Sequence, residues 1–331
     1  MTELDHRVLV TGANGFVGSH LAEALLAQGY QVRCMVRQSS DLTHIRDLPV
    51  EWCFADLSEP AGLGDACRDV DAVCHCAALT RAPDEETFLR VNARGTEALA
   101  WAAMEANPNL KRFLFLSSQA AAGPAPGMDA VIDESHPPHP VTWYGKSKLA
   151  AERALANMQP GLPATIIRSA AVFGPRDRDF YRYFDLVKRG VSLYPGRSNR
   201  WLSLAYVHDL VALMLLTLEN VRAVGAVYFA SSYAVSHREL AETIARTLHK
   251  RPVHIGIPDT ALSLIGLWSR VQTRLTGKAP LLNEQRIVDM RQAYWLCSAE
   301  KAGQELGYAA KSDLETAIRE TADWYVEHGW L

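Results

Sequence analysis

The sequence predicts an α/β protein built on a doubly wound parallel sheet. Six short apolar segments alternate with stretches of helical spacing through the first two-thirds of the chain, as strands joined by crossover helices do. A glycine-rich turn directly follows the first of these segments. The chain has 331 residues, 48% of them apolar and 21% charged, which is enough for one large domain or two smaller ones with a buried core.

The predicted elements follow one another in a regular order. Strands are expected at 7–10, 31–36, 50–54, 71–77, 112–117 and 164–169, and helices between them at 16–29, 84–106 and 143–158. The alternation weakens beyond residue 175, where helices are expected at 207–220, 236–248 and over most of 299–329, with a strand at 226–230. We assign residues 1–175 to the sheet domain, with segments near 202–235 returning to it. Residues 176–331 form mainly a smaller, mostly helical substrate-binding region.

Charge and cysteine content exclude several classes of protein. The 34 Lys and Arg residues against 37 Asp and Glu give a net charge of −3, so no basic excess indicates nucleic-acid binding. A strand-like segment begins within the first residues, which leaves no room for a signal peptide. The six cysteines lie mostly in apolar segments, and Cys74-His75-Cys76 is interpreted as part of a buried strand, not as a metal site. We therefore expect a reduced, cytoplasmic protein without a metal.

The turn at residues 11–18 is suited to a phosphate group. Glycine allows a sharp bend and lets the backbone approach a pyrophosphate without a Cβ in the way. The helix that follows directs free N–H groups and its positive dipole end at the anion. The predicted dinucleotide-binding residues of this turn are Gly12, Asn14, Gly15, Phe16, Val17 and Gly18.

With Thr11, this spacing resembles the TGxxGxxG signature of short-chain dehydrogenases/reductases, particularly their extended branch, the NAD-dependent epimerase/dehydratase superfamily. The resemblance covers nearly the whole chain and implies a Rossmann fold that binds a nicotinamide dinucleotide. It also implies cofactor contacts after the third strand, after the fourth strand and in the segment VNARGT. These positions are Asp56 and Leu57, then Cys76, Ala77 and Ala78, and finally Asn92.

The end of the second predicted strand favours NADP over NAD. NAD-binding proteins usually place an acid there to bind the adenine ribose. Here that position is Val36, followed by Arg37, with Ser39 and Ser40 nearby. A guanidinium can pair with the 2′-phosphate of NADP, and no acid repels that phosphate. The alternative is that Arg37 stacks on adenine or faces solvent, and NAD then remains a candidate.

Tyr144 and Lys148 stand four residues apart in a predicted helix, so they lie on one face of it. A tyrosine with the ordinary pKa of about 10 is a poor base at neutral pH, and a nearby ammonium would lower that pKa. The pair resembles the family's YxxxK motif. The resemblance implies that Tyr144 is the catalytic acid/base and that Lys148 also holds the nicotinamide ribose. Lys146 is expected to point to another side of the helix.

The resemblance implies a third catalytic group, a hydroxyl at the end of the fifth strand. In the extended branch this hydroxyl lies five residues before a glycine, which selects Ser118 relative to Gly123. Its implied role is to hydrogen-bond the substrate oxygen beside Tyr144. Ser117 is left as a candidate cap of the strand end.

Two departures from the sugar-nucleotide enzymes of the family favour an apolar substrate. Ala171 stands where those enzymes commonly carry an asparagine, and Leu202 stands where they commonly carry an arginine. Two polar anchors for a diphosphate are thus replaced, although Arg197 and Arg200 lie close enough in the sequence to substitute for them.

Segment 258–276 is rich in large apolar residues and contains Arg270 and Arg274. It is expected to be a substrate lid, a helix of the core, or a weak contact with a membrane surface.

The motifs are closest to those of 3β-hydroxysteroid dehydrogenases and dihydroflavonol reductases. The resemblance implies hydride transfer between nicotinamide and a secondary alcohol or ketone of a bulky apolar substrate. A 4-carboxysterol could then lose CO₂ without another catalytic residue. A nucleotide-sugar epimerase is the alternative, and a non-catalytic dinucleotide-sensing protein is the remote one. A homodimer formed through 84–106 and 143–158 is also implied.

Overall fold

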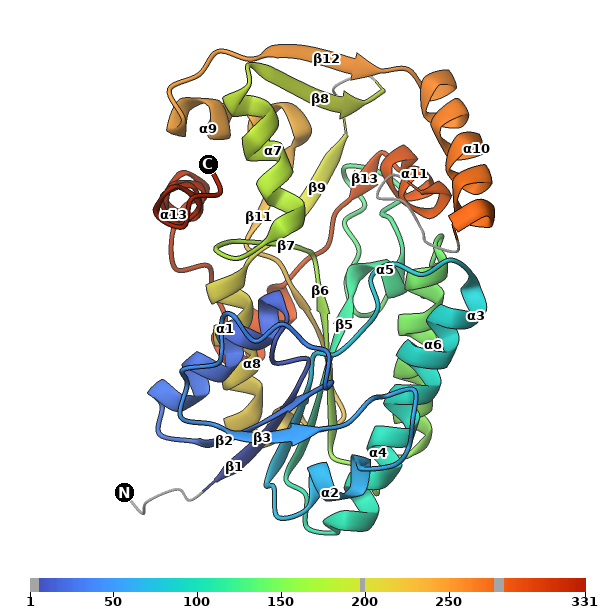
Figure 1. Ribbon diagram of the computed structural model, residues 1–331, viewed down its shortest axis with the longest axis vertical. Coiled ribbons are helices and arrows are strands. Elements are labelled where there is room, and N and C mark those ends of the chain that lie inside the picture. The colour runs from blue at the N-terminus through green and yellow to red at the C-terminus, as the bar shows by residue number, and fades with distance from the viewer. Residues whose placement is uncertain (1–5, 197–199, 277–282) are drawn as a thin grey trace.

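A computed structural model describes residues 6–196, 200–276 and 283–331 (Figure 1). Its centre is a seven-stranded sheet in the order β10-β6-β5-β4-β1-β2-β3, with every neighbouring pair parallel. The strands are β1 (Arg7–Thr11), β2 (Gln31–Val36), β3 (Glu51–Phe54), β4 (Ala72–His75), β5 (Arg112–Ser118), β6 (Ala164–Ser169) and β10 (Val227–Ala230). This order is that of a doubly wound Rossmann sheet, which confirms the predicted fold class.

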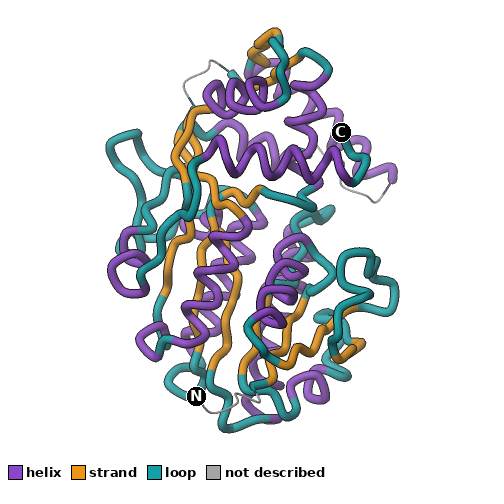
Figure 2. The backbone as a smooth tube through the Cα atoms, turned by 90° about the vertical axis from the view of Figure 1, so that its left-hand side faces the viewer, coloured by secondary structure: helices purple, strands orange, loops and turns teal. Residues whose placement is uncertain are grey.

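Helices cover both faces of this sheet (Figure 2). Helices α1 (Phe16–Ala27) and α8 (Val207–Glu219) pack together on one face, and α2 (Leu63–Cys67), α4 (Gly95–Ala106) and α6 (Trp143–Asn157) pack on the other. Successive residues of a strand point to opposite faces. Val8 and Val10 therefore belong to one buried cluster, and Leu9 belongs to the other. The apolar runs in the sequence are continuous because the strands are buried on both sides.

The predicted helix over 84–106 consists of three pieces. These are α3 (Glu85–Phe88), the π-helical segment η1 (Leu89–Arg94) and α4. Asp84 begins the first piece, because its carboxylate accepts the Thr87 N–H at 2.7 Å. The wider π turn contains Asn92, which is 1% exposed. The expectation of one continuous helix was therefore wrong in this detail.

The remaining elements lie mostly above the carboxyl edge of the sheet (Figure 1). Strand β9 (Trp201–Tyr206) pairs with β7 (Ala171–Phe173), β11 (Tyr233–Ser236) and β13 (Tyr294–Trp295), while β8 (Val191–Pro195) pairs with β12 (Val253–Ile257). These short strands were not predicted. The helical elements are α5 (Gln119–Ala122), α7 (Arg178–Lys188), η2 (Val221–Ala223), α9 (His237–Thr247), α10 (Asp259–Thr276), α11 (Glu284–Arg291), α12 (Glu300–Leu306) and α13 (Leu314–Glu327). Within the described ranges, none of the helices combines the length and apolar character needed to cross a membrane.

Candidate active site

The turn between β1 and α1 brings the predicted phosphate-binding residues together. Gly12 has a left-handed φ of 67°, and a Cβ added there would lie 2.7 Å from the Cα and N of Ala77. Gly15 is the N-cap of α1, where no side chain caps the helix and no acid lies in the first turn. The first N–H groups of a helix have no partner within it. The turn therefore fits an anionic pyrophosphate, with Asn14, Phe16, Val17 and Gly18 beside it.

Replacing Gly12 by alanine should damage both this turn and the fold. The added Cβ would meet backbone atoms of Ala77 at a left-handed φ, so we expect the free energy of unfolding to fall by more than about 2 kcal/mol. Gly29→Ala is the matched control, since Gly29 has a φ of 85° with no atom within 4 Å of the added Cβ. It should cost about 1 kcal/mol. Urea denaturation and titration with NADPH fluorescence would test both variants; equal losses would show that the contact with Ala77 is unimportant.

The predicted adenine-facing residues lie at the ends of β2 and β3. Arg37 is exposed, and its backbone N–H donates to Ser40 Oγ at 3.0 Å. Asp56 accepts the N–H and the hydroxyl of Ser58, both at 2.8 Å. The bond from the Ser58 N–H is the main cause that holds the pKa of Asp56 low, and the nearby Arg37 guanidinium adds to it. Leu57 is buried, and an added Cβ at Gly95 would lie 2.9 Å from it.

A buried chain of hydrogen bonds connects the turn after β1 to the π-helical segment. Thr11 Oγ1 accepts the Ala77 N–H at 3.3 Å and lies 2.7 Å from His75 Nδ1. His75 Nε2 lies 2.8 Å from Thr96 Oγ1, which donates to the Asn92 carbonyl at 2.6 Å. Burial lowers the pKa of His75 to about 3, so its ring is neutral. Both ring nitrogens therefore have partners within the protein, and Cys76, Ala77 and Ala78 follow in the adjoining segment.

The Asn92 side chain connects this network to the helix that carries Tyr144. Its Oδ1 accepts the Leu79 N–H at 2.8 Å, and its Nδ2 donates to the Leu79 carbonyl at 2.9 Å. The same Nδ2 donates to Ser147 Oγ on α6 at 3.1 Å. One amide thus holds the segment after β4 and the first turns of α6 in a fixed relation.

The N-terminus of α6 brings Tyr144 to Ser118. Thr142 caps the helix by accepting the Gly145 N–H at 3.1 Å. Gly145 permits a close approach to α5, because a Cβ there would lie 2.2 Å from the Ala120 carbonyl oxygen. Ser118 ends β5 and accepts the Ala120 N–H at 3.2 Å, and its hydroxyl lies near enough to the Tyr144 hydroxyl to act on the pKa of that group. Ser118, and not Ser117, therefore caps α5.

The ionisation of Tyr144 differs from the expectation. Burial raises the pKa of Tyr144 to about 12, and the hydrogen bond from Ser118 only partly opposes this rise. Lys148 lies one turn further along α6, but its Nζ donates to the Leu116 carbonyl at 2.6 Å and lies 4.1 Å from the centre of the Phe115 ring. Burial also lowers the pKa of Lys148 to about 7. The predicted lowering of the tyrosine pKa was wrong because desolvation of the phenolate is the larger effect.

Two further charged residues lie behind these groups, and the sequence reasoning missed them. Glu152 on α6 and Arg168 on β6 form an ion pair at 2.7 Å, with side chains 5% and 6% exposed. Ser117 donates its hydroxyl to the same carboxylate at 2.5 Å. The available signal was Arg168 inside the apolar segment ATIIRS, since a buried arginine needs an anionic partner.

Helix α11 and the sheet formed by β7, β9, β11 and β13 lie on the other side of the candidate site from the main sheet. Gln285 Oε1 accepts the Trp143 N–H at 2.8 Å, which joins α11 to the start of α6. Ala171 is exposed on β7, whereas Leu202 is buried in the core. Of the two alternative anchors, Arg200 donates to the Met290 carbonyl, and Arg197 lies outside the described residues. Lys146 is exposed and pairs with Glu85 at 3.2 Å.

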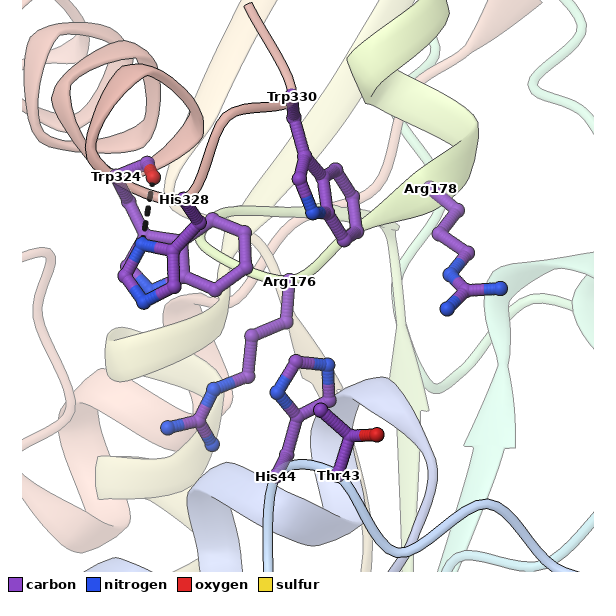
Figure 3. Close-up of a pocket in the computed structure, with 7 residues that line it drawn as sticks. All are labelled: Thr43, His44, Arg176, Arg178, Trp324, His328 and Trp330. Atoms are coloured by element: carbon purple, nitrogen blue, oxygen red, sulfur yellow. Dashed lines mark hydrogen bonds between the residues drawn. The ribbon is translucent and has the colours of Figure 1, made fainter.

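A cavity of about 400 Å³ lies elsewhere, between α13, the loop after β2 and the loop before α7 (Figure 3). Its lining residues are Thr43, His44, Arg176, Arg178, Trp324, His328 and Trp330, and none of them is a predicted site residue. Arg176 already pairs with Glu23 on α1 at 2.7 Å. The chemistry predicted from the sequence is therefore located at Ser118 and Tyr144, away from this cavity.

The parallel sheet, the uncapped glycine turn and the Ser118–Tyr144 pair define a class, the nicotinamide-dependent oxidoreductases of the extended short-chain type. The model of the family described as "NAD dependent epimerase/dehydratase family" matches residues 8–230. The chain belongs to this family. Its relatives include the ceramide reductase of Caulobacter vibrioides, 29% identical over 98% of this chain and 96% of that protein. Sterol demethylase protein B of Methylococcus capsulatus is 28% identical over 98% of this chain and 99% of that protein.

Solved structures of the family share the fold. The UDP-glucose 4-epimerase of Thermus thermophilus in complex with NAD superposes with a TM-score of 0.79 and 22% identity, covering 97% of this chain and 99% of that one.

Proposed function

We propose that the enzyme reduces a ketone of a bulky apolar substrate to the secondary alcohol. The observation that carries the proposal is the juxtaposition of the Ser118 and Tyr144 hydroxyls at the end of β5, with a tyrosine whose pKa burial raises to about 12. At neutral pH Tyr144 keeps its proton, so its hydroxyl can donate that proton to a substrate oxygen that Ser118 also binds. The nicotinamide, when bound, supplies the hydride.

The residues that would hold this cofactor lie along the carboxyl edge of the sheet. The pyrophosphate would be bound by Gly12, Asn14, Gly15, Phe16, Val17 and Gly18. The adenosine end would be bound by Arg37, Asp56 and Leu57. The nicotinamide half would lie along Cys76, Ala77, Ala78, Asn92, Tyr144 and Lys148. The Lys148 ammonium uses one of its three donors on the Leu116 carbonyl, which leaves two donors for a ribose hydroxyl.

An apolar substrate is supported by the residues at positions 171 and 202. Position 202 contributes a buried leucine, and position 171 an exposed alanine, so neither offers a charge to a diphosphate. The names of two relatives, a ceramide reductase and a sterol demethylase protein, fit the same substrate class. Oxidation of a 4-carboxysterol with loss of CO₂ is another reaction of an apolar substrate. It needs the phenolate of Tyr144, and we therefore place it behind reduction.

The direction of the reaction can be tested by its pH dependence. Reduction uses the protonated tyrosine, so its rate should stay level from neutral pH into the alkaline range. Oxidation of the product alcohol uses the phenolate, so its rate should rise about tenfold per pH unit below the pKa of about 12. Initial rates in both directions across pH 7 to about 10 measure this. An oxidation rate that levels off near neutral pH would contradict the raised pKa.

We further propose NADP as the preferred cofactor, since Arg37 is the exposed cation at the end of β2. Arg37→Ser should weaken NADPH binding at least about tenfold and leave NADH binding nearly unchanged. Arg94→Ser, which removes an exposed arginine paired with Glu86, is the control. Titration of both nucleotides measures the effect. Equal weakening of both would place Arg37 against the shared adenosine, and no effect would place it in solvent.

The proposed activity is tested by offering purified enzyme NADPH or NADH with a panel of long-chain ketones, 3-ketosteroids and dihydroflavonols. UDP- and dTDP-hexoses are assayed in parallel for epimer formation. Oxidation of the nucleotide with an apolar ketone supports the proposal. Epimerised sugar without net oxidation of the nucleotide would overturn it and would indicate an epimerase.

Homodimer formation through α4 and α6 is also proposed. Trp101 on α4 is 49% exposed, which leaves an aromatic side chain available to a second copy. Light scattering on wild type and Trp101→Glu tests it, since a dimer through α4 should dissociate in the variant.

A further inference from the structure

Helix α10 has a buried side and an exposed side that carries large apolar residues. Leu262, Gly266 and Ser269 are buried against the rest of the molecule. Leu264, Leu267 and Trp268 are 69%, 61% and 71% exposed. At about 100° per residue, these two sets lie on opposite faces of the helix. A surface helix normally presents polar residues on its outer face, so this one has an outer face suited to an apolar environment.

The strand that leads into α10 also carries exposed apolar residues. Val253 and Ile255 alternate along β12 and are 65% and 45% exposed, so they lie on the same side of the strand. Strand β12 leads into α10, and the two elements lie at the end of the molecule away from the N-terminus (Figure 1). We call Val253, Ile255, Leu264, Leu267 and Trp268 the cap patch. It contains five of the twelve exposed large apolar residues in the described ranges.

Basic residues flank the cap patch. Lys188 and Arg189 lie just before β8, separated from it by Gly190, and Lys250 and Arg251 lie just before β12, separated from it by Pro252. The two strands are parallel with Val191 opposite Val253, so the four exposed cations lie at the same end of this small sheet. Asp185 pairs with Arg189 at 2.9 Å, which still leaves a positive excess. The charge complements an anionic surface.

We propose that the cap patch docks on the surface of an anionic lipid bilayer. Leu264, Leu267 and Trp268 would insert among the headgroups, and Lys250 and Arg251 would contact lipid phosphates. Tryptophan favours such an interface, because its ring is apolar and its N–H can remain hydrogen-bonded. The side chains protrude from the outer side of a helix, which suits insertion into lipid.

The position of the cap patch links it to the reaction. Helix α10 packs on α11, and Gln285 of α11 is bonded to the start of α6 beside Tyr144. An enzyme docked by α10 would hold its substrate wall next to the bilayer, where a bulky apolar ketone is concentrated. This benefit rests on the proposed function, whereas docking itself requires only the cap patch and the flanking cations.

The test is co-sedimentation of the purified full chain with vesicles, without substrate. Wild type should bind vesicles of phosphatidylcholine with phosphatidylglycerol. The variant L264S/L267S/W268S should bind at least about tenfold more weakly, since the inserted apolar area is lost. The variant K250Q/R251Q should lose most of the preference for phosphatidylglycerol. The control V221S/V224S/V326S removes exposed valines elsewhere and should bind as wild type does.

Circular dichroism and NADPH titration confirm that each variant is folded. Wild type that does not bind, or a leucine–tryptophan variant that binds as well as wild type, would overturn the proposal. If that variant instead converts a dimer to a monomer and wild type ignores vesicles, the cap patch is a contact between two copies. Reduction of a water-soluble ketone should be unchanged in the variant, so failure of docking and failure of the proposed activity are distinguishable.

Discussion

The Tyr144→Phe enzyme should lose turnover by about a hundred- to ten-thousandfold while still binding its nucleotide. Phenylalanine keeps the ring that lies edge-on to Phe88 at 6.1 Å between centroids, so the packing of α6 should be preserved. What is lost is the hydroxyl that lies beside Ser118 and that would donate a proton to the substrate oxygen. The measurement is kcat for ketone reduction, together with the dissociation constant of NADPH.

A matched control separates this effect from a general effect of removing a tyrosine hydroxyl. Tyr181 donates its hydroxyl to the Trp330 carbonyl at 2.5 Å, on a part of the molecule that holds none of the predicted site residues. Tyr181→Phe should retain kcat within about twofold, because a single hydrogen bond contributes about 1 kcal/mol to stability and nothing to proton transfer. Full turnover in Tyr144→Phe would show that another group supplies the proton.

The Glu152→Gln protein should lose about 3–5 kcal/mol of unfolding free energy. The amide has nearly the shape of the carboxylate but no charge, so the Arg168 guanidinium would be left buried without its anion. Ser117 would also lose a strong acceptor. The loss should reach activity as well, because Ser117 directly precedes Ser118. Urea denaturation followed by circular dichroism and by tryptophan fluorescence measures the change and tests whether unfolding is two-state.

Burial is the variable that this prediction isolates. Asp65 and Arg68 form a similar pair at 2.8 Å with side chains 74% and 68% exposed, so Asp65→Asn should cost less than about 1 kcal/mol. Removing both partners of the buried pair, as Glu152→Leu with Arg168→Met, should recover much of the loss. If the buried and exposed pairs respond alike, the ion pair behind β5 is not held in a low-dielectric environment.

The main sheet could be predicted because its determinants are local. Each strand is an apolar run ended by a turn, and each crossover has helical spacing, so the order of elements can be read along the chain. The strands β7, β8, β9, β11, β12 and β13 were missed because they are short or pair with segments distant in sequence. Two residues, as in β13, contain no periodicity to detect. The break at η1 was also hidden, because π-helical and α-helical turns carry nearly the same residue pattern.

The sequence places the candidate groups on their elements, but it does not give the electrostatics around them. The spacing of Tyr144 and Lys148 placed both on α6, and the structure brings Ser118 to the tyrosine. The pKa of Tyr144 could not be read from spacing, because it depends on how many atoms from other segments exclude water from the hydroxyl. Glu152 was missed for a similar reason: its partner Arg168 lies on a different element, and only the fold makes them neighbours.

The hydrogen-bond chain through His75 restricts what this position can tolerate. The single hydroxyl proton of Thr96 goes to the Asn92 carbonyl, so Thr96 Oγ1 must accept from Nε2–H of His75. The imidazole is neutral, so Nδ1 carries no proton and accepts from the Thr11 hydroxyl. The direction of every bond from Ala77 to Asn92 is thereby determined, and with it the tautomer. A residue that replaces His75 must accept a hydrogen bond from Thr11 and donate one to Thr96 across the same distance. Glutamine has both groups, whereas leucine would leave the Thr11 hydroxyl proton without its acceptor and the Thr96 oxygen without its donor.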